Sequence, residues 1–395
     1  MKILFPYMSR WRTANRSRYH QLLTHLCRRG HEVMILTAPP MALPDISSRD
    51  IDDSRELPAG MVISELFAPS LLRRFWEQDI PRTKLLKKGL ISISSIPQLR
   101  SVIRQEKVDL LFLYNLPQLL LLELADCRVH FDLADDLVAM MEGEDRLLFR
   151  CGGGFAASVV QRHMVRRAET VTVASNVLAA QIDRPVLLLP NGADLEELDQ
   201  IASTEQRAIE NEPRRSRPVV GFVGALEYWV NLDLMVDVAA RLDNCDFLIV
   251  GGGRRLAELR SLVEQRQLRN VVLTGPKAYQ EAMRLVVRMD VCLLPFEQTP
   301  VSDGSCPLKL FEYAALRRPV VSTTTTEVHR IGAGWVWFAD SAADFAAVIA
   351  GALVDPREVA RRVDAGRALV ESTYNWPHLA ARFEKYLGDT LSGQG

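Results

Sequence analysis

The sequence lacks the features that mark several large classes of protein. No stretch approaches the ~20 consecutive apolar residues that span a bilayer, so it predicts no transmembrane helix. The 48 lysines and arginines are balanced by 49 aspartates and glutamates, which leaves a net charge of −1. Dedicated nucleic-acid-binding proteins usually carry a strong basic excess, so we expect no nucleic-acid partner.

Paired cysteines and export signals are also missing. The six cysteines are scattered, and none forms a C-x-x-C pair, which argues against a zinc cluster and against a disulfide framework. Unpaired cysteines are typical of a reducing compartment. The apolar run at residues 1–6 is too short for the core of a signal peptide. We therefore expect a cytoplasmic protein, with a peripheral position on the inner face of the membrane as a further hypothesis.

Strand-like and helix-like segments alternate along the chain, and a length of 395 residues suits two domains. Such alternation predicts an α/β fold with mostly parallel sheets and helices on both faces. The polar segment 201–217 has a linker composition, so we expect one domain over residues 1–200 and a second over residues 218–370. Residues 371–395 are predicted as a C-terminal helix that packs back on the N-terminal domain.

No G-x-G-x-x-G follows the first strand of either half, which argues against a dehydrogenase. Two doubly wound domains instead bind ligands at the carboxyl ends of their strands, in a cleft. The most informative loop there is Val-Ser-Asp-Gly-Ser-Cys-Pro-Leu-Lys-Leu-Phe-Glu-Tyr at residues 301–313.

Pro307 suits the first position of a helix, with Ser305 as its capping residue. The unpaired N–H groups of a helix start, here around Pro307 and Leu308, suit a diphosphate. Lys309 adds a full positive charge, and Glu312 follows on the same face, where it can accept hydrogen bonds from ribose hydroxyls. A plain capped helix is the alternative interpretation, because such helices occur in any protein.

Residues 305–321 resemble the donor-binding motif of GT-B-fold glycosyltransferases, especially bacterial enzymes that build surface polysaccharides. The turn at residues 29–33 and the Pro-Asn-Gly-Ala-Asp segment at residues 190–194 extend the resemblance. It implies two doubly wound, Rossmann-like domains facing a cleft, with an acceptor-binding domain at residues 1–200 and a nucleotide-sugar-binding domain at residues 218–370. It also implies that the lysine and the helix start hold the diphosphate and that the glutamate holds the ribose. By family frequency we expect a UDP-sugar as co-substrate and no cofactor.

The sequence departs from that family at two points. Many retaining members carry a second glutamate where this chain has Gly304. Many also carry a basic pair after the first strand of the C-terminal domain, where residues 224–231 contain none. Gly224 still allows close approach of the backbone, and Tyr228 or Trp229 is a candidate for stacking on a base or sugar. Because both departures argue against a retaining site, we expect an inverting reaction. No D-x-D motif is evident at the donor loop, so we expect no metal.

Three carboxylates follow an N-terminal-domain strand, at Asp132, Asp135 and Asp136. The resemblance implies a general base at this point, and an acceptor hydroxyl needs one to lose its proton. Clustered carboxylates raise one another's proton affinity. We therefore predict that Asp132 or Asp135 is the base. The alternative for Asp135 and Asp136 is capping of the next helix.

Acceptor and membrane contacts are predicted from basic residues. Arg16 and Arg18 begin the first helix, where related enzymes handle acceptor or phosphate; a solvated helix face is the alternative. Residues 71–88 mix basic and bulky apolar side chains, which suits an anionic membrane surface and a lipid-linked acceptor. An ordinary basic helix face is the alternative here too.

The sequence thus predicts a glycosyltransferase that moves a sugar from a nucleotide diphosphate sugar to a hydroxyl of a glycan or lipid-linked glycan in polysaccharide biosynthesis. Two alternatives stay open. One is a nucleotide-sugar epimerase on the same fold, which needs no acceptor. The other is a catalytically inactive, sugar-binding member of the family.

Overall fold

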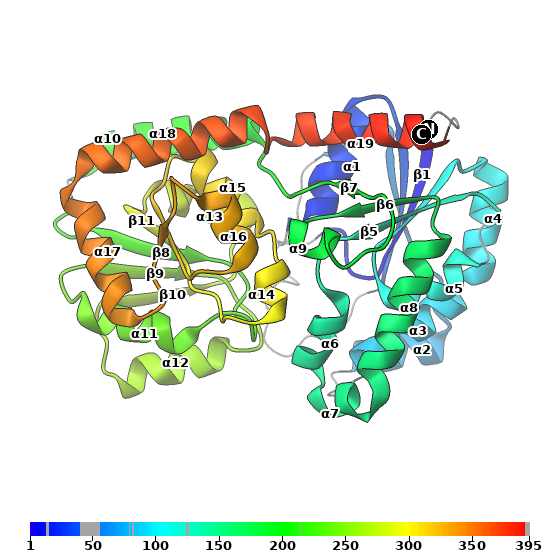
Figure 1. The fold of residues 1–395 in the computed structure, drawn as a ribbon, viewed down its shortest axis with the longest axis horizontal. Helices are drawn as coiled ribbons and strands as arrows, with labels where there is room; N and C mark the ends of the chain where they lie inside the picture. The colour runs from blue at the N-terminus through cyan, green and yellow to red at the C-terminus, as the bar shows by residue number, and fades with distance from the viewer. Residues whose placement is uncertain are drawn as a thin grey trace.

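The computed structural model describes residues 1–12, 16–39, 56–78, 80, 83–123, 126–213 and 215–391. These residues form two α/β domains that lie side by side (Figure 1). Each domain is built on a parallel sheet. The predicted fold class, two doubly wound α/β domains, is confirmed.

The N-terminal sheet has the strand order β3-β2-β1-β4-β5-β6-β7, and the C-terminal sheet has the order β10-β9-β8-β11-β12-β13. The strands are β1 (Lys2–Tyr7), β2 (Glu32–Thr37), β3 (Met61–Glu65), β4 (Leu110–Leu113), β5 (Arg128–Leu133), β6 (Thr170–Val173), β7 (Leu187–Leu188), β8 (Val219–Val223), β9 (Asp246–Val250), β10 (Val271–Gly275), β11 (Val291–Leu294), β12 (Val320–Ser322) and β13 (Trp337–Phe338). In both sheets the strand order reverses beside the first strand, at β1/β4 and at β8/β11, which is where such folds bind ligands.

Helices connect the strands and cover the sheets. In the N-terminal domain they are α1 (Arg18–Arg28), α2 (Ser70–Glu77), α3 (Lys84–Ser94), α4 (Ile96–Glu106), the short η2 (Leu116–Gln118), α5 (Leu119–Leu122), α6 (Leu137–Glu144), α7 (Arg146–Leu148), the turn η3 (Phe149–Gly153), α8 (Gly154–Arg167) and α9 (Asn176–Ala179). The following helices are α10 (Leu195–Glu210), α11 (Leu232–Arg241), α12 (Leu256–Gln265), α13 (Tyr279–Val287), α14 (Pro300–Gly304), α15 (Leu308–Ala315), α16 (Thr326–Gly332), α17 (Ala342–Val354), α18 (Pro356–Ser372) and α19 (Trp376–Leu391).

Strand β1 shows why the N-terminal sheet has two cores. Ile3 and Phe5 point to one face and pack with α1 and α19, while Leu4 points to the other face and packs with α4 and α8. A parallel strand covered on both faces reads as a continuous apolar run, as β1 does. In α1 the stripe that includes Leu22 and Leu26 is fully buried, as its helical spacing predicts.

The segment predicted as a linker, residues 201–217, is mostly helical. Helix α10 runs through it to Glu210, and Leu198 and Ile201 are buried in the core of the C-terminal domain. Leu195, Ala202 and Ile209 of α10 pack against the same core, so its apolar residues lie on one face of the helix. The polar composition therefore marked an amphipathic helix of the second domain.

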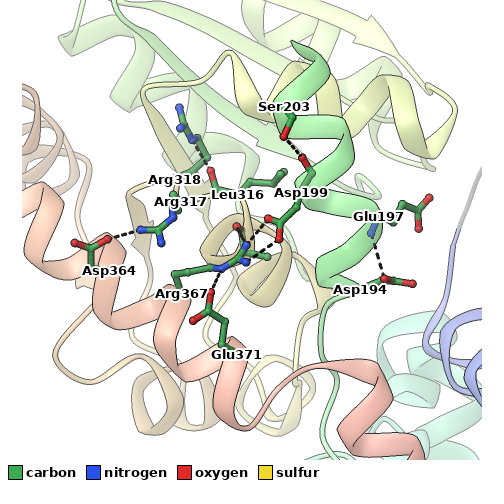
Figure 2. A network of polar contacts seen from close by, with 11 residues as sticks. Asp194, Glu197, Asp199, Ser203, Leu316, Arg317, Arg318, Asp364, Arg367 and Glu371 are labelled. Atoms are coloured by element: carbon green, nitrogen blue, oxygen red, sulfur yellow. Dashed lines mark hydrogen bonds and ion pairs between the residues drawn. The ribbon is translucent and has the colours of Figure 1, made fainter. Parts of the chain in front are cut away.

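A polar network joins α10 to α18 and to the end of α15 (Figure 2). Arg367 on α18 donates to both carboxylate oxygens of Asp199 on α10, at 2.6 and 2.9 Å. It also donates to the carbonyl oxygen of Ala315 at 2.8 Å and pairs with Glu371 at 2.6 Å. The network fixes α18, which leads directly to α19.

Helix α19 crosses from the C-terminal domain back to the N-terminal domain, so that both chain ends lie on the same domain (Figure 1). Trp376, Leu379 and Phe383 are fully buried in the core formed with α1 and β1. The crossing ties the two domains together on the side away from α7 (Figure 1).

Candidate functional site

A cavity of about 540 Å3 lies between the two domains. Its N-terminal wall comes from the loops after β1 and β5, and its C-terminal wall comes from the loops after β8, β9, β10 and β11. The predicted donor-binding residues that line it are Gly224, Ser305, Pro307, Leu308 and Lys309. Asp135 of the catalytic prediction lines it too, as do Arg16 and Arg18, which were predicted for acceptor or phosphate. The topology thus brings most of the predicted residues to one place.

The predicted helix start is present, but its details differ from expectation. Residues Pro300–Gly304 form the short helix α14, which the side chain of Thr299 caps. Helix α15 then begins at Leu308, with Pro307 as the residue that precedes its first turn and with no side-chain cap. Ser305 therefore ends α14 and does not cap α15. The first N–H groups of α15 have no intrahelical acceptor and point to the cavity end of the helix.

Lys309 lies at this helix start, with its Nζ 2.7 Å from Oε2 of Glu312. The Glu312 side chain is only 3% exposed and is not among the residues that line the cavity. In this arrangement Glu312 pairs with Lys309, and its carboxylate does not line the cavity. The expected direct opening of Glu312 to a ligand is therefore absent from this structure.

The Tyr279 ring lies close to two positive side chains at the site, those of Arg16 and Lys309. Its ring centroid lies 4.9 Å from Cζ of Arg16 and 5.6 Å from Nζ of Lys309. Arg16 comes from the N-terminal domain and forms an ion pair with Glu197 of α10. The missing basic pair after β8 thus has a partial counterpart in Arg16, which reaches the same place from the opposite domain.

Lys277 is a positive residue at the cavity that the sequence reasoning missed. It lines the cavity just after β10 and pairs with Glu281 at 2.7 Å. Its position at the carboxyl end of a parallel strand is the signal that would have found it.

The loop after β8 corrects one donor-site prediction. Gly224 lines the cavity. A Cβ at position 251 would lie 1.9 Å from the carbonyl oxygen of Gly224, so glycine is needed at position 251 for the two backbones to come this close. Tyr228 does not line the cavity. Its hydroxyl donates to the carbonyl oxygen of Met140 at 3.4 Å, and its ring packs on Gly143 of α6. Trp229, the alternative considered with it, is the aromatic residue that lines the cavity.

The three carboxylates after β5 have different environments. Asp132 is fully buried, accepts from Nη2 of Arg18 at 2.9 Å and from Thr172 at 2.5 Å, and cannot reach a substrate. Asp136 caps α6 by accepting from the N–H of Ala139 at 2.9 Å. The prediction of Asp132 as a base therefore does not fit the structure, and the capping alternative fits Asp136.

Asp135 is exposed to the cavity. The surrounding walls screen it from bulk water and raise its pKa above the usual carboxyl value; Arg18 opposes this rise, while Asp132 and Asp136 add to it. Its position and its raised proton affinity both suit a general base.

A buried chain of hydrogen bonds supports Asp132 from behind. Nδ1 of His130 lies 3.0 Å from the Thr170 hydroxyl, and Nε2 lies 3.0 Å from the Thr172 hydroxyl. Because Thr172 gives its proton to Asp132, Nε2 must be the protonated nitrogen of a neutral imidazole. Burial lowers the pKa of His130 to about 3, which agrees with the neutral form.

Arg18 and Arg16 have separate roles in the structure. Arg18 is 3% exposed and donates to Asp132, to the carbonyl oxygen of Leu189 and to the side chain of Asn191. Asn191 in turn donates to the carbonyl oxygen of Cys306, beside the start of α15. Arg18 therefore joins the walls of the cleft through buried hydrogen bonds, whereas Arg16 lines the cavity and pairs with Glu197.

Among the described residues, no group of three or more His, Cys, Asp or Glu side chains is arranged to hold a metal ion. No described helix is both long enough and apolar enough to cross a membrane. In the predicted membrane segment, Trp76 and Lys87 are buried, and Leu71 and Leu86 are exposed. Arg82 lies outside the described residues.

Comparisons with known proteins agree with this geometry. Residues 217–355 match the family described as glycosyl transferases group 1. These residues are a group 1 glycosyl transferase domain. TuaH of Bacillus subtilis, whose name assigns it to teichuronic acid biosynthesis as a glycosyltransferase, is 26% identical over 53% of this chain. The match spans about half of that relative, 54% of its length.

Two solved structures show the same fold over nearly the whole chain. Sucrose-phosphate synthase from Thermosynechococcus elongatus superimposes with a TM-score of 0.78 at 17% identity, covering 99% of both chains. HepE of Anabaena, solved in complex with UDP-glucose, gives a TM-score of 0.68 at 14% identity, covering 98% of this chain and 100% of its own. The chain has the GT-B fold, and the predicted resemblance is confirmed.

Proposed function

We propose that this chain transfers a sugar from a nucleotide diphosphate sugar to a hydroxyl of a glycan or lipid-linked glycan in polysaccharide biosynthesis. The observation that carries the proposal is the placement of Asp135 and the start of α15 on the same cavity, one from each domain. The donor would bind with its diphosphate at α15, Lys309 and Arg16. The acceptor hydroxyl would approach from the side of Asp135.

A UDP-sugar is the proposed donor. The support is the family match of the C-terminal domain and the UDP-glucose complex of HepE, a protein of the same fold. The backbones of Gly224 and Gly251 approach each other closely at the ends of β8 and β9, in the wall of the cavity where the base would lie. Trp229 adds an aromatic surface to the same wall.

The mechanism that we propose is inverting. Asp135 accepts the proton of the acceptor hydroxyl as its oxygen attacks the anomeric carbon, and the bond from that carbon to the nucleotide diphosphate breaks. Lys309, Arg16 and the helix start stabilise the negative charge that the leaving diphosphate gains. Two observations support a base over a two-glutamate retaining site: Gly304 presents no carboxylate, and Asp135 faces the cavity.

The test is a matched pair of substitutions. Asp135→Asn removes the base and should lower transfer by about 10²–10⁴-fold while leaving donor binding in place. Asp136→Asn keeps the cap of α6, because asparagine caps as well as aspartate, and should transfer at nearly the original rate. Equal activity of the two variants would reject Asp135 as the base.

The stereochemistry and the need for an acceptor complete the test. NMR of the anomeric proton should show that the product has the configuration opposite to that of the donor; a retained configuration would reject the inverting mechanism. Conversion of the donor sugar without any acceptor would instead favour an epimerase. Donor binding without turnover over a panel of acceptors would favour an inactive, sugar-binding protein.

A further inference from the structure

The Pro-Asn-Gly-Ala-Asp segment at residues 190–194 lies at a junction of the two domains. It leads from β7, the edge strand of the N-terminal sheet, to α10, whose apolar face packs in the core of the C-terminal domain. Asn191 is a buried residue of this segment and belongs to the wall of the cavity. The segment therefore reaches both domains and the proposed donor site at one point.

The crossing between α18 and α19 fixes the backbone of this segment. The Ala193 N–H donates to the carbonyl oxygen of Tyr374 at 2.9 Å, and the Trp376 N–H donates to the carbonyl oxygen of Ala193 at 3.1 Å. A Cβ at Gly192 would lie 2.5 Å from the Tyr374 carbonyl oxygen, so glycine is needed for this close approach. Asn191 is thus followed at once by backbone that is held in place.

The side-chain amide of Asn191 connects this segment with the start of α15. Its Nδ2 donates to the carbonyl oxygen of Cys306, and its Oδ1 accepts from Nη1 of Arg18 at 3.0 Å. Because a carbonyl only accepts and a guanidinium only donates, the two contacts fix which end of the amide is the nitrogen. The Asn191 N–H also donates to the Cys306 sulfur at 3.4 Å. One residue therefore binds both the carbonyl and the thiol of Cys306.

Arg18 holds the other end of the amide. Its side chain is 3% exposed and forms an ion pair with Asp132 at 2.9 Å, where Asp132 is fully buried. It also donates to the carbonyl oxygen of Leu189 at 3.1 Å. Hydrogen bonds that involve ionised groups are about twice as strong as neutral ones, so the guanidinium is a firm support for Asn191.

The Cys306 carbonyl belongs to the peptide that begins the proposed donor site. Because the next residue is Pro307, this peptide has no N–H, and its carbonyl oxygen is the only group by which a hydrogen bond can hold it. No side chain of the described residues caps α15, so the first turn has no anchor of that kind. The hydrogen bond from Asn191 therefore sets the direction in which the chain enters α15.

We propose that Asn191 is a positioning residue of the donor site, which holds the Cys306–Pro307 peptide and so aims the first N–H groups of α15 at the diphosphate. The inference rests on the proposed function and deepens it, because it gives the segment after β7 a part in donor binding that acts through α15. It also gives the buried pair of Arg18 and Asp132 a role, which is to support the Asn191 amide.

Affinities for UDP and for uridine, measured by calorimetry on the whole chain, test the proposal. Asn191→Ala removes the hydrogen bond to the Cys306 carbonyl and should weaken UDP binding by about 3- to 10-fold, the effect of one hydrogen bond. Uridine has no diphosphate to meet the start of α15, so its affinity should stay that of the wild type. Unchanged UDP affinity in Asn191→Ala would overturn the proposal.

The control variant is Asn270→Ala. Nδ2 of Asn270 also donates to backbone carbonyl oxygens, at 3.0–3.1 Å, but Asn270 precedes β10 and so lies at the end of the sheet opposite the cavity. It should lower the melting temperature by a similar amount or more and leave the ratio of the UDP and uridine affinities unchanged. An equal change of that ratio in both variants would show that UDP binding follows stability, which would overturn the proposal.

Asn191→Asp separates the two contacts of the amide. An ionised aspartate still accepts from Arg18 but has no hydrogen to donate to the Cys306 carbonyl. It should therefore bind UDP as weakly as Asn191→Ala or more weakly. Recovery of the wild-type UDP affinity in Asn191→Asp would place the effect at Arg18 and contradict the role of the Cys306 carbonyl.

The wild type separates this proposal from the proposed function. Wild-type protein that binds UDP no more tightly than uridine would reject the donor site and, with it, both proposals. Wild-type protein that prefers UDP, together with an Asn191→Ala variant that prefers UDP as strongly, would reject the role of Asn191 and leave the proposed function standing.

Discussion

Replacing Gly143 by alanine would place a methyl group between the two domains. Gly143 lies within α6 of the N-terminal domain, and the Tyr228 ring of the C-terminal domain packs directly on it. The added Cβ would lie 2.2 Å from Cε2 and 2.4 Å from Cζ of that ring. Since carbon atoms pack at about 3.5–4.0 Å, the ring must retreat by more than about 1 Å.

Two opposing effects follow from this substitution. In the helix itself, alanine is more favourable than glycine by about 0.5–1 kcal/mol. With the two domains in contact, as they are in this structure, pushing the Tyr228 ring away from Gly143 costs about 1–3 kcal/mol, the usual range for overpacking. If the donor needs both walls of the cavity, its affinity should fall by about 5- to 150-fold, while the unfolding temperature stays the same or rises.

Titration of UDP or a UDP-sugar by calorimetry, together with thermal unfolding, measures both effects. Gly351→Ala in α17 is the matched control, because a Cβ there meets nothing within 4 Å. Adding Tyr228→Ala to Gly143→Ala should restore most of the affinity, since it removes the atoms that clash. Unchanged donor affinity in Gly143→Ala would refute the reasoning that donor binding needs the two domains in contact at Gly143 and Tyr228.

Three further predictions concern pH and stability. Below about pH 6.5 the unfolded chain gains a proton at His130, whereas the folded chain, in which the pKa of His130 is about 3, does not. The free energy of unfolding should therefore fall by about 1.4 kcal/mol for each unit of decreasing pH. In urea unfolding between about pH 6 and pH 5, His130→Gln should show a flatter decline, and a slope identical to that of the wild type would contradict this. Activity should be lost as the pH falls through the raised pKa of Asp135, because the base must be ionised. The apparent pKa of the acid limb of kcat/KM should therefore lie above the ordinary carboxyl value of 3.8. An apparent pKa at or below 3.8 would count against Asp135 as the base. Arg367→Met removes the contacts to Asp199 and Ala315 and should lower the free energy of unfolding by about 1–3 kcal/mol. The control, Arg317→Met, breaks an exposed ion pair and should lower it by less than about 1 kcal/mol. Similar losses in the two variants would show that the network does not anchor α18.

The sequence predicted the parts of the fold that periodicity encodes. The buried strands β1, β4 and β8 are continuous apolar runs, and the stripe of α1 repeats at helical spacing, so both were evident. Edge strand β3 was not predicted, because only Met61 of its five residues is buried and no apolar alternation marks it. Helix α10 was mistaken for a linker because its buried face holds few apolar residues.

The loop predicted as the donor site lies at the cavity, but the directions of the side chains around it were not predicted. The direction of an aromatic side chain in a loop depends on what the other domain places beside it. Tyr228 packs on Gly143 of α6 and therefore does not point into the cavity. Likewise, sequence spacing puts Glu312 and Lys309 on one helix face but does not show that they pair with each other. Asp132 and Asp135 were equivalent in sequence, and only strand burial separates them.

The central claim is that the cavity between the domains binds the diphosphate of a nucleotide sugar. The most direct measurement compares the melting temperature of the wild type and of Lys309→Gln over a titration with UDP and with uridine. UDP should raise the wild-type melting temperature through mass action, uridine should raise it far less, and Lys309→Gln should need a much higher UDP concentration for the same rise. Equal responses to UDP and uridine, or equal responses of the two proteins to UDP, would contradict the claim.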